Sequence, residues 1–129
     1  MIKMTMFLKR RAGLSHEDFV THHIEVHGPK FRSIPEAGAH CLCYIQTHPV
    51  ELETDAAKNA DFDGTAELWF DSEQGMEAVL TSETYKKVVF PDEKTFLDHD
   101  NTLILVGEQV NIIGDHRGTH PVRPALPGE

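Results

Sequence analysis

Apolar and polar residues alternate with a period of two in four stretches of the chain, a pattern typical of β-strands that bury one face. These stretches cover residues 2–9, 40–47, 64–70 and 102–113. In the second stretch the alternation places Tyr44 on one face and both Cys41 and Cys43 on the other. The third carries apolar residues on both sides, so both of its faces are expected to be largely buried. The pattern therefore predicts four strands, of which the last is long and strongly apolar.

Residues 15–29 follow the helical period instead and predict one amphipathic helix. Ser15 suits its N-cap and Gly28-Pro29 suit its end, because glycine favours helix termination and proline cannot continue a helix. After this helix, residues 30–38 are expected to be irregular. Two of their apolar side chains are predicted to fill the core, those of Phe31 and Ile34.

The second half of the chain predicts a long loop and a second helical region. Residues 48–63 are acidic and carry no strand or helix pattern, so they are expected to form either a solvated insertion or a lid. Asp71 is the predicted N-cap of a helix with an apolar inner side. A second helical piece that starts at Ser82 is expected to break at Pro91.

The order strand, helix, strand, strand, helix, strand predicts an α+β fold of the ferredoxin-like βαββαβ type, with one four-stranded antiparallel sheet covered by helices on one face. The uncovered face is expected to carry large apolar side chains, those of Phe7, Tyr44 and Trp69. Because such a face is unfavourable in water, the sequence predicts a homodimer that packs sheet against sheet. The domain is expected to span residues 1–113, followed by a proline-rich tail over residues 114–129 that is disordered or extended across a neighbouring subunit.

The composition is that of a folded protein, with 129 residues of which 40% are apolar. A formal net charge of −9 argues against nucleic acid or an anionic membrane as a partner, because both bind basic surfaces. No apolar run reaches the roughly 18 residues of a membrane span, and the first residues lack the layout of a signal peptide, so a cytoplasmic location is expected. The two cysteines stand two residues apart in a strand, which suits free thiols better than a disulfide or a metal site.

Three histidines near the end of the first helix are the main candidates for chemistry. At about 100° per residue, His23 and His27 lie within the apolar stripe, whereas His22 lies at the edge of the polar side and is expected to be solvated. An inward histidine is often a core residue with one hydrogen-bonded ring nitrogen, but imidazole also suits acid–base catalysis at neutral pH. His27, beside the helix end, is the stronger candidate. His99, just before the last strand, is either a second acid–base group or an exposed turn residue.

A pocket between helix and sheet is predicted around these histidines, as a site for a small hydrophobic molecule. Its apolar walls are expected to come from Tyr44, Trp69, Phe90 and Phe96. Glu67 is expected beside Trp69, where a buried carboxylate would need a partner. Either Glu67 or Asp98 could orient a histidine through its other ring nitrogen.

Two segments resemble the EthD family. The first is KRRAGLSHEDFVTHHIEVHGP at residues 9–29, and the second is FDGTAELWFDSEQGMEAVLTSETYKKVVFPDEKTFLDHDN at residues 62–101. The resemblance covers about residues 3–110. It implies the dimeric α+β-barrel fold, in agreement with the order of elements. The family includes fungal relatives similar to decarboxylases and dehydratases of aromatic polyketide pathways, and the wider fold includes muconolactone isomerases and polyketide cyclases, so the fold is implied more narrowly than the reaction.

The sequence thus favours a cofactor-free lyase or isomerase that uses histidine acid–base catalysis on a small oxygenated hydrophobic or aromatic metabolite. No metal site and no cofactor is expected. One alternative is a non-catalytic protein that binds a small molecule and assists a degradation or biosynthesis pathway. The other is a cofactor-independent monooxygenase, or a metal-assisted enzyme with His23 and His27 as ligands one turn apart.

Overall fold

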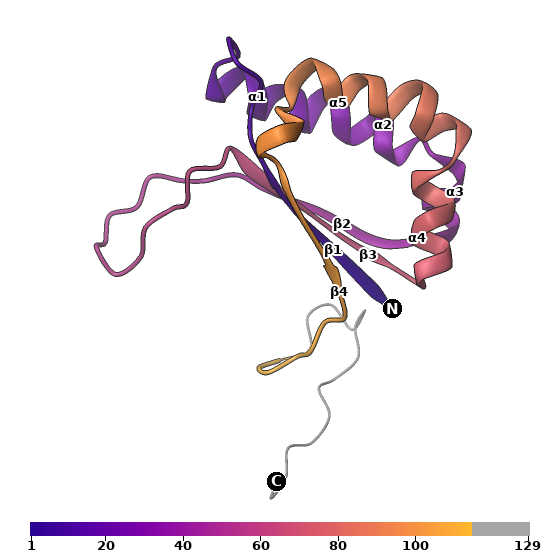
Figure 1. Cartoon of the computed structure of the whole chain (residues 1–129). Helices are drawn as coiled ribbons and strands as arrows, with labels where there is room; N and C mark the ends of the chain where they lie inside the picture. The colour runs from indigo at the N-terminus through magenta and orange to yellow at the C-terminus, as the bar shows by residue number, and fades with distance from the viewer. Residues whose placement is uncertain (115–129) are drawn as a thin grey trace, which may run out of the picture.

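Four antiparallel strands form one sheet in the computed structural model, which describes residues 1–114 (Figure 1). The strands are β1 (Ile2–Leu8), β2 (Cys41–Thr47), β3 (Gly64–Phe70) and β4 (Leu103–Gly107). Their order across the sheet is β2-β3-β1-β4, which places the first strand of the chain in the interior and makes β2 and β4 the edges. Together with the helices this is the predicted α+β, ferredoxin-like arrangement, and the prediction is confirmed.

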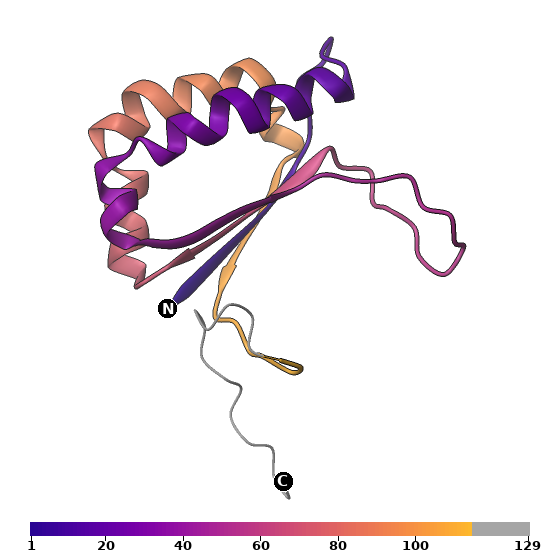
Figure 2. The same ribbon diagram turned by 180° about the vertical axis from the view of Figure 1, so that it is seen from behind.

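All the helices lie on one side of the sheet, as the view from behind shows (Figure 2). The first helical run consists of α1 (His16–His22), the π-helix η1 (His23–His27) and α2 (Gly28–Arg32), followed by α3 (Pro35–His40). The second consists of α4 (Glu73–Leu80), the π-helix η2 (Tyr85–Val89) and α5 (Phe90–Phe96). A short 3-10 helix, η3 (His99–Asn101), leads into β4. No helix among the described residues is long and apolar enough to cross a membrane.

The core lies between the helices and the inner face of the sheet. Its strand residues alternate as the sequence predicts, with Met4 and Leu8 from β1 and with Ala66, Leu68 and Phe70 from β3. Both side chains expected to fill the core after the first helix, those of Phe31 and Ile34, are part of it. The other core residues of the helix layer are Phe19, Val79, Val89 and Phe96. Burial of these side chains is the main force that holds the helix layer on the sheet.

The first helix does not end at Gly28-Pro29, contrary to the prediction. The chain continues from η1 directly into α2, and α2 together with a further helix, α3, occupies most of the stretch expected to be irregular. Pro29 stands in the first turn of α2. Backbone N–H groups in the first turn of a helix have no acceptor within that helix, so a proline there costs no hydrogen bond. The backbone N–H of Gly28 instead donates to the carbonyl of His23, which closes a five-residue π turn.

Pro91 does not break the second helical region either. It lies in the first turn of α5, which follows η2 without interruption. The N-cap of α4 is Ser72 rather than Asp71, and its hydroxyl accepts a hydrogen bond from the backbone N–H of Gly75 at 2.9 Å. At Pro29 and Pro91, proline therefore marks the start of a helix and not its end.

Strand β2 departs from simple alternation. The register of its pairing with β3 shifts between Cys41 and Cys43, and this bulge brings Cys41 onto the core side together with Tyr44. Tyr44 therefore faces the helices and not the uncovered face, so that part of the prediction is wrong. Both cysteines are free and partly buried. At the other edge, β4 ends at Gly107 and is shorter than expected.

Residues 48–63 form a long loop without helix or strand, as the sequence indicates. The loop projects away from α3 and α4 and is joined to the domain at both ends (Figure 1). At its start, Nε2 of His48 and Nδ1 of His23 share a hydrogen bond at 2.9 Å. At its end, the buried carboxylate of Asp63 accepts hydrogen bonds from Arg10 and His16. The predicted tail lies outside the described residues, apart from Gly114.

Candidate active site

A cavity of about 230 Å³ lies between the helices and the sheet. Its walls combine apolar core residues with five side chains that can exchange or share a proton: His27, Tyr44, Tyr85, Glu93 and His99. Apolar walls with a few converging polar groups are typical of small-molecule sites. Three of the side chains predicted for the site, His27, Tyr44 and His99, therefore meet here, and Phe90 lines the same cavity.

His27 is placed by the π turn of η1 and held by a carboxylate. Its Nδ1 lies 2.9 Å from Oδ2 of Asp92, which is buried at the start of α5. The same carboxylate also contacts Nε2 of His22 at 2.9 Å and Nζ of Lys30 at 3.3 Å. Asp92, rather than Glu67 or Asp98, is thus the residue that orients the histidine.

The geometry fixes the tautomer of His27. Burial acts to raise the pKa of Asp92, but the hydrogen bonds from His27 and His22 outweigh it and leave that pKa below its usual range. An ionised carboxylate only accepts hydrogen bonds, so Nδ1 of His27 must carry the proton and Nε2 the lone pair. Burial lowers the pKa of His27 against the opposing effect of Asp92, which favours the neutral, basic form of the ring.

His22 is not the solvated surface residue that the helical wheel predicts. It is partly buried and shares Asp92 with His27, five residues later. At 100° per residue the two rings would diverge by about 140°. The π turn between them adds one residue to the turn and brings positions i and i+5 onto the same side.

The cavity also holds a hydrogen-bonded pair, Tyr85 and Glu93. Tyr85 donates a hydrogen bond from its hydroxyl to Oε2 of Glu93 at 2.7 Å. Burial raises the pKa of Glu93 and also raises the pKa of Tyr85. Tyr44 accepts a hydrogen bond from Nε2 of Gln46 at 2.8 Å, and burial raises its pKa to about 12. These groups therefore favour their neutral forms, which can donate a proton or a hydrogen bond.

His99 and Phe90 lie at the exposed side of the cavity. Their rings are 5.7 Å apart, and both residues are exposed on one side while lining the cavity on the other. This position lets His99 contact both solvent and a bound molecule. It fits an acid–base group that exchanges protons with water.

His23 and Phe96 lie behind the cavity rather than on its lining. His23 is fully buried, and its ring centroid is 5.9 Å from that of Phe96. Burial lowers the pKa of His23 to about 3, and its Nε2 has no hydrogen-bond partner among the described residues. The ring of Phe96 packs on His27 at 4.9 Å between centroids. Both residues therefore support His27 from the side away from a ligand.

Glu67 and Trp69 lie on the other face of the sheet, away from this cavity. Alternation along β3 directs them opposite to the core residues Ala66 and Leu68. Glu67 forms an ion pair with Nζ of Lys3 at 3.0 Å, and the indole of Trp69 donates to the side-chain oxygen of Gln109 at 2.8 Å. The partner expected for the carboxylate is thus a lysine on the neighbouring strand.

Sequence reasoning missed Asp92, Glu93 and Tyr85. A signal for two of them exists, because Tyr85, Val89 and Glu93 follow one another at a spacing of four residues. In one helix this spacing places them on the same face as the buried Val89. Asp92 had no such signal, since its contact with His27 depends on how the two helical runs pack. Within residues 1–114, no group of three or more histidine, cysteine or acidic side chains is arranged to hold a metal ion.

The fold and the cavity define an α+β protein of the ferredoxin-like type, with a histidine–aspartate pair in a small apolar site. The EthD domain matches residues 11–100, more than half of the chain, and the protein belongs to the EthD family. A comparison with proteins of curated function gave no match.

Several solved structures share the fold. An EthD family protein from Bacillus halodurans C-125 is 17% identical with a TM-score of 0.65, and the match covers 84% of this chain and 98% of that one. An EthD-like protein from Ralstonia eutropha JMP134 is 16% identical with a TM-score of 0.63, covering 89% and 96%. A dimeric ferredoxin-like protein from Thermobifida fusca YX is 13% identical with a TM-score of 0.59, covering 82% and 88%.

Proposed function

We propose that the protein is a lyase or isomerase that moves a proton on a small oxygenated hydrophobic compound, with His27 as the general base. The observation that carries this proposal is the hydrogen bond between Nδ1 of His27 and the buried Asp92, which leaves the basic Nε2 for a molecule in the cavity. A base held in one tautomer by a carboxylate is a recurring arrangement in acid–base catalysis.

The reaction would begin with removal of a proton from a carbon next to a carbonyl. Nε2 of His27 takes the proton, and the negative charge that develops on the carbonyl oxygen receives a hydrogen bond from the hydroxyl of Tyr44 or the carboxylic acid of Glu93. Return of the proton to another carbon gives an isomer, whereas loss of a neighbouring hydroxyl with a proton gives water. The shifts that favour neutral Glu93 and neutral His27 suit these two roles.

His99 completes the proposal as the group that returns the proton to solvent. It lies at the exposed side of the cavity beside Phe90, which would cover a bound ring. The apolar lining excludes water from the rest of the site, which strengthens each hydrogen bond to the reacting oxygen. A cavity of about 230 Å³ suits a compound of one or two small rings.

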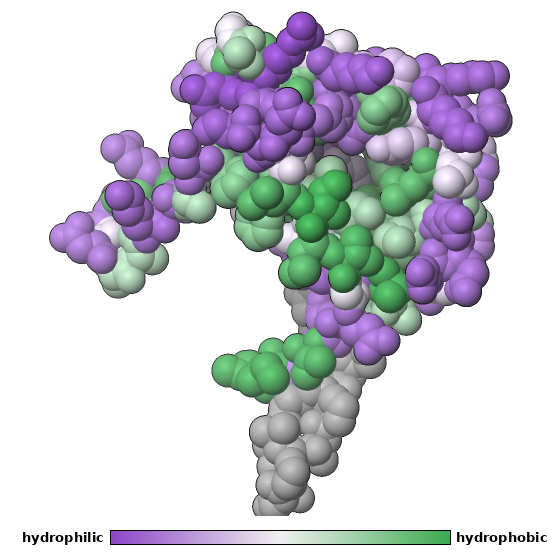
Figure 3. Space-filling view, viewed as in Figure 1, coloured by the Kyte–Doolittle hydropathy of each residue, from purple (hydrophilic) through white to green (hydrophobic). Residues whose placement is uncertain are grey.

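We also propose that the chain works as a homodimer. The side chains of β4 are exposed on both faces of the sheet, and Leu105 is 67% exposed. Apolar surface gathers around β4 and beneath the helices (Figure 3). The dimeric description of the Thermobifida fusca neighbour supports the same assembly for this fold. Burial of this surface against a second copy would remove exposed apolar side chains of β4 from water.

The test of the proposed chemistry needs no knowledge of the natural substrate. A panel of small cyclic ketones and lactones is incubated with the protein in D₂O, and exchange of the protons next to the carbonyl is followed by NMR. We expect exchange with the wild type. With His27→Gln the exchange rate should fall by at least about 10²-fold. Lys58→Gln, an exposed loop variant, is the matched control and should keep the wild-type rate.

The outcomes separate the candidate functions. Exchange that is equally fast in His27→Gln contradicts the role of the histidine. Binding of panel compounds without exchange by the wild type favours the non-catalytic alternative. Consumption of dissolved oxygen with product formation favours the monooxygenase.

A further inference from the structure

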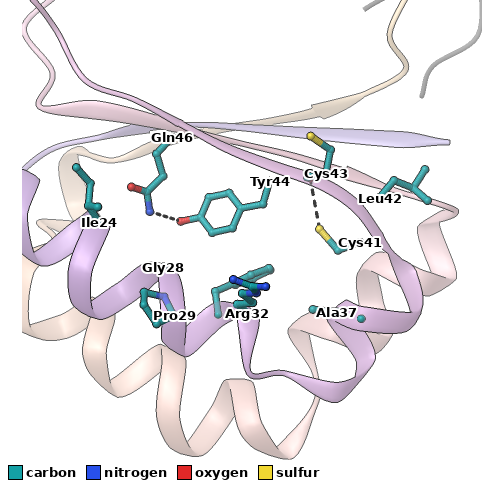
Figure 4. Close-up of a pocket in the computed structure, with 12 residues that line it drawn as sticks. Ile24, Gly28, Pro29, Arg32, Ala37, Cys41, Leu42, Cys43, Tyr44 and Gln46 are labelled. Atoms are coloured by element: carbon teal, nitrogen blue, oxygen red, sulfur yellow. Dashed lines mark hydrogen bonds between the residues drawn. The ribbon is translucent and has the colours of Figure 1, made fainter. Parts of the chain in front are cut away.

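A second cavity, here called the edge pocket, lies beside β2 at the outer edge of the sheet (Figure 4). Its volume is about 590 Å³, within the usual range for ligand sites. Helices α2 and α3 form one wall and strand β2 forms the other. Its main side chains are Ile24, Pro29, Arg32, Leu42, Tyr44 and Gln46.

The edge pocket is separate from the candidate active site. Phe31 and Tyr44 line both cavities, and their rings meet edge to face with centroids 5.1 Å apart, so the pair forms a partition. His27 and Glu93 line only the inner cavity. A molecule in the edge pocket would therefore contact Tyr44 but not His27, Glu93 or His99.

Arg32 gives the edge pocket its charge. It is the one ionised side chain of the lining, and no carboxylate of the described residues lies within ion-pair distance of its guanidinium. The arginine lies across from Tyr44, on the helix side of the pocket (Figure 4). In a protein with a net charge of −9, an unpaired arginine beside an apolar wall is a local attraction for an anion.

The remaining polar groups are arranged to bind a hydroxyl. The amide nitrogen of Gln46 donates to the hydroxyl of Tyr44 and to the backbone carbonyl of His23, each at 2.8 Å. This leaves the amide oxygen of Gln46 as an acceptor and the Tyr44 hydroxyl as a donor. Both point from β2 toward α2, whereas Ile24 and Leu42 are half exposed and present apolar surface.

We propose that the edge pocket binds a small hydrophobic molecule that carries one carboxylate. The carboxylate pairs with Arg32, and the hydrophobic part lies against Ile24, Pro29 and Leu42. Charge complementarity and the apolar wall together select this ligand class over a neutral compound or a cation. The site would let the protein sense an acidic substrate, product or pathway intermediate without using the inner cavity.

The test compares 2-naphthoate with its neutral analogue, 2-naphthamide, by titration of ¹⁵N-labelled protein. We expect 2-naphthoate to bind about tenfold more tightly and to shift the amide signals of residues in the edge pocket. Arg32→Gln should lower the affinity for 2-naphthoate to that for 2-naphthamide. High salt should weaken 2-naphthoate binding in the same way, because Arg32 is exposed.

A second variant blocks the edge pocket without changing its charge. A β-carbon at Gly38 would have no heavy atom within 4 Å, so Gly38→Phe can place a ring in the pocket without a backbone clash. It should abolish binding of both compounds. Lys58→Gln, which removes an exposed positive charge elsewhere, should leave both affinities unchanged, and so should His27→Gln.

Equal affinity for the two compounds would overturn the proposal, as would wild-type affinity in Arg32→Gln. Signal shifts confined to the inner cavity would also overturn it. Absence of binding would do the same and would indicate that another part of the assembly, such as a second copy of the chain, covers β2. Because His27→Gln is a control here, failure of this proposal leaves the proposed catalytic role untouched.

Discussion

The buried ring of His23 predicts a specific loss of stability in acid. His23 is fully enclosed by the core, and its Nε2 has no partner to share a second proton among the described residues. A protonated imidazole there would be a buried and poorly solvated charge. The folded protein therefore resists protonation at this position, whereas the unfolded chain does not.

The magnitude follows from the two pKa values. The pKa of His23 is about 3 in the folded protein, against 6.5 in an unfolded chain. The stability that comes from keeping the ring neutral is fully present above pH 6.5 and is lost as the pH falls toward 3. Each unit below 6.5 costs about 1.4 kcal/mol, so lowering the pH from 7 to 5 should reduce the free energy of unfolding by about 2 kcal/mol through His23 alone.

Urea denaturation at pH 7, 6 and 5 measures this loss in the wild type and in His23→Leu. The variant has no proton to bind at this position, so its free energy of unfolding should fall by about 2 kcal/mol less than that of the wild type over the same range. Phe96→Leu is the matched control. It weakens the packing next to His23 at every pH and should keep the wild-type pH dependence.

Parallel pH dependences in the wild type and His23→Leu would refute the reasoning. The His27 and His48 rings, whose pKa values are also lowered by burial, contribute in the same direction, whereas Glu93, whose pKa is raised by burial, contributes in the opposite direction. Only the difference between the two proteins isolates His23.

Asp92→Asn should lower turnover at least tenfold and leave the fold intact, because an amide can donate as well as accept and so no longer fixes the tautomer of the histidine; steady-state kinetics with circular dichroism checks this. Leu105→Glu should produce a monomer by light scattering, and an unchanged dimer would exclude β4 from the interface. Asp63→Ala should lower the free energy of unfolding by about 2 kcal/mol, since the backbone N–H of Arg10 loses its buried acceptor; wild-type stability in urea would contradict it. Removal of residues 51–58 should leave the melting temperature almost unchanged, and an equal loss of stability and activity would make that loop structural.

Strands β1 and β3 were predictable because their side chains alternate strictly, whereas the bulge of β2 and the early end of β4 leave no such pattern. Met4 and Leu8 on β1, like Ala66 and Leu68 on β3, face the core as the period of two requires. The helix ends were not predictable by the same rules. The rule that proline ends a helix failed at two positions because the residue there begins a new α-helical segment behind a π turn.

The candidate site was predictable only in part, for the same reason. The inward direction of His27 follows from the helical wheel and is what the structure shows. The wheel assumes one period along the whole helix, so it could not bring His22 and His27 to a common carboxylate. Asp92 comes from a segment 65 residues later, and no local pattern in the chain reports such a contact.

The two π turns, η1 and η2, point to a particular route by which this cavity could arise and be altered. Each holds one residue more than the α-helical turn it replaces, so each can be gained by insertion of one codon or lost by deletion of one codon. Loss of one residue from 23–27 would rotate the helix on one side of that turn relative to the other and would separate His22 from His27. Amino-acid replacement keeps the number of residues and cannot reproduce that change. A library of one-codon deletions through 23–27 and 85–89 would therefore sample cavity shapes that replacement libraries never reach.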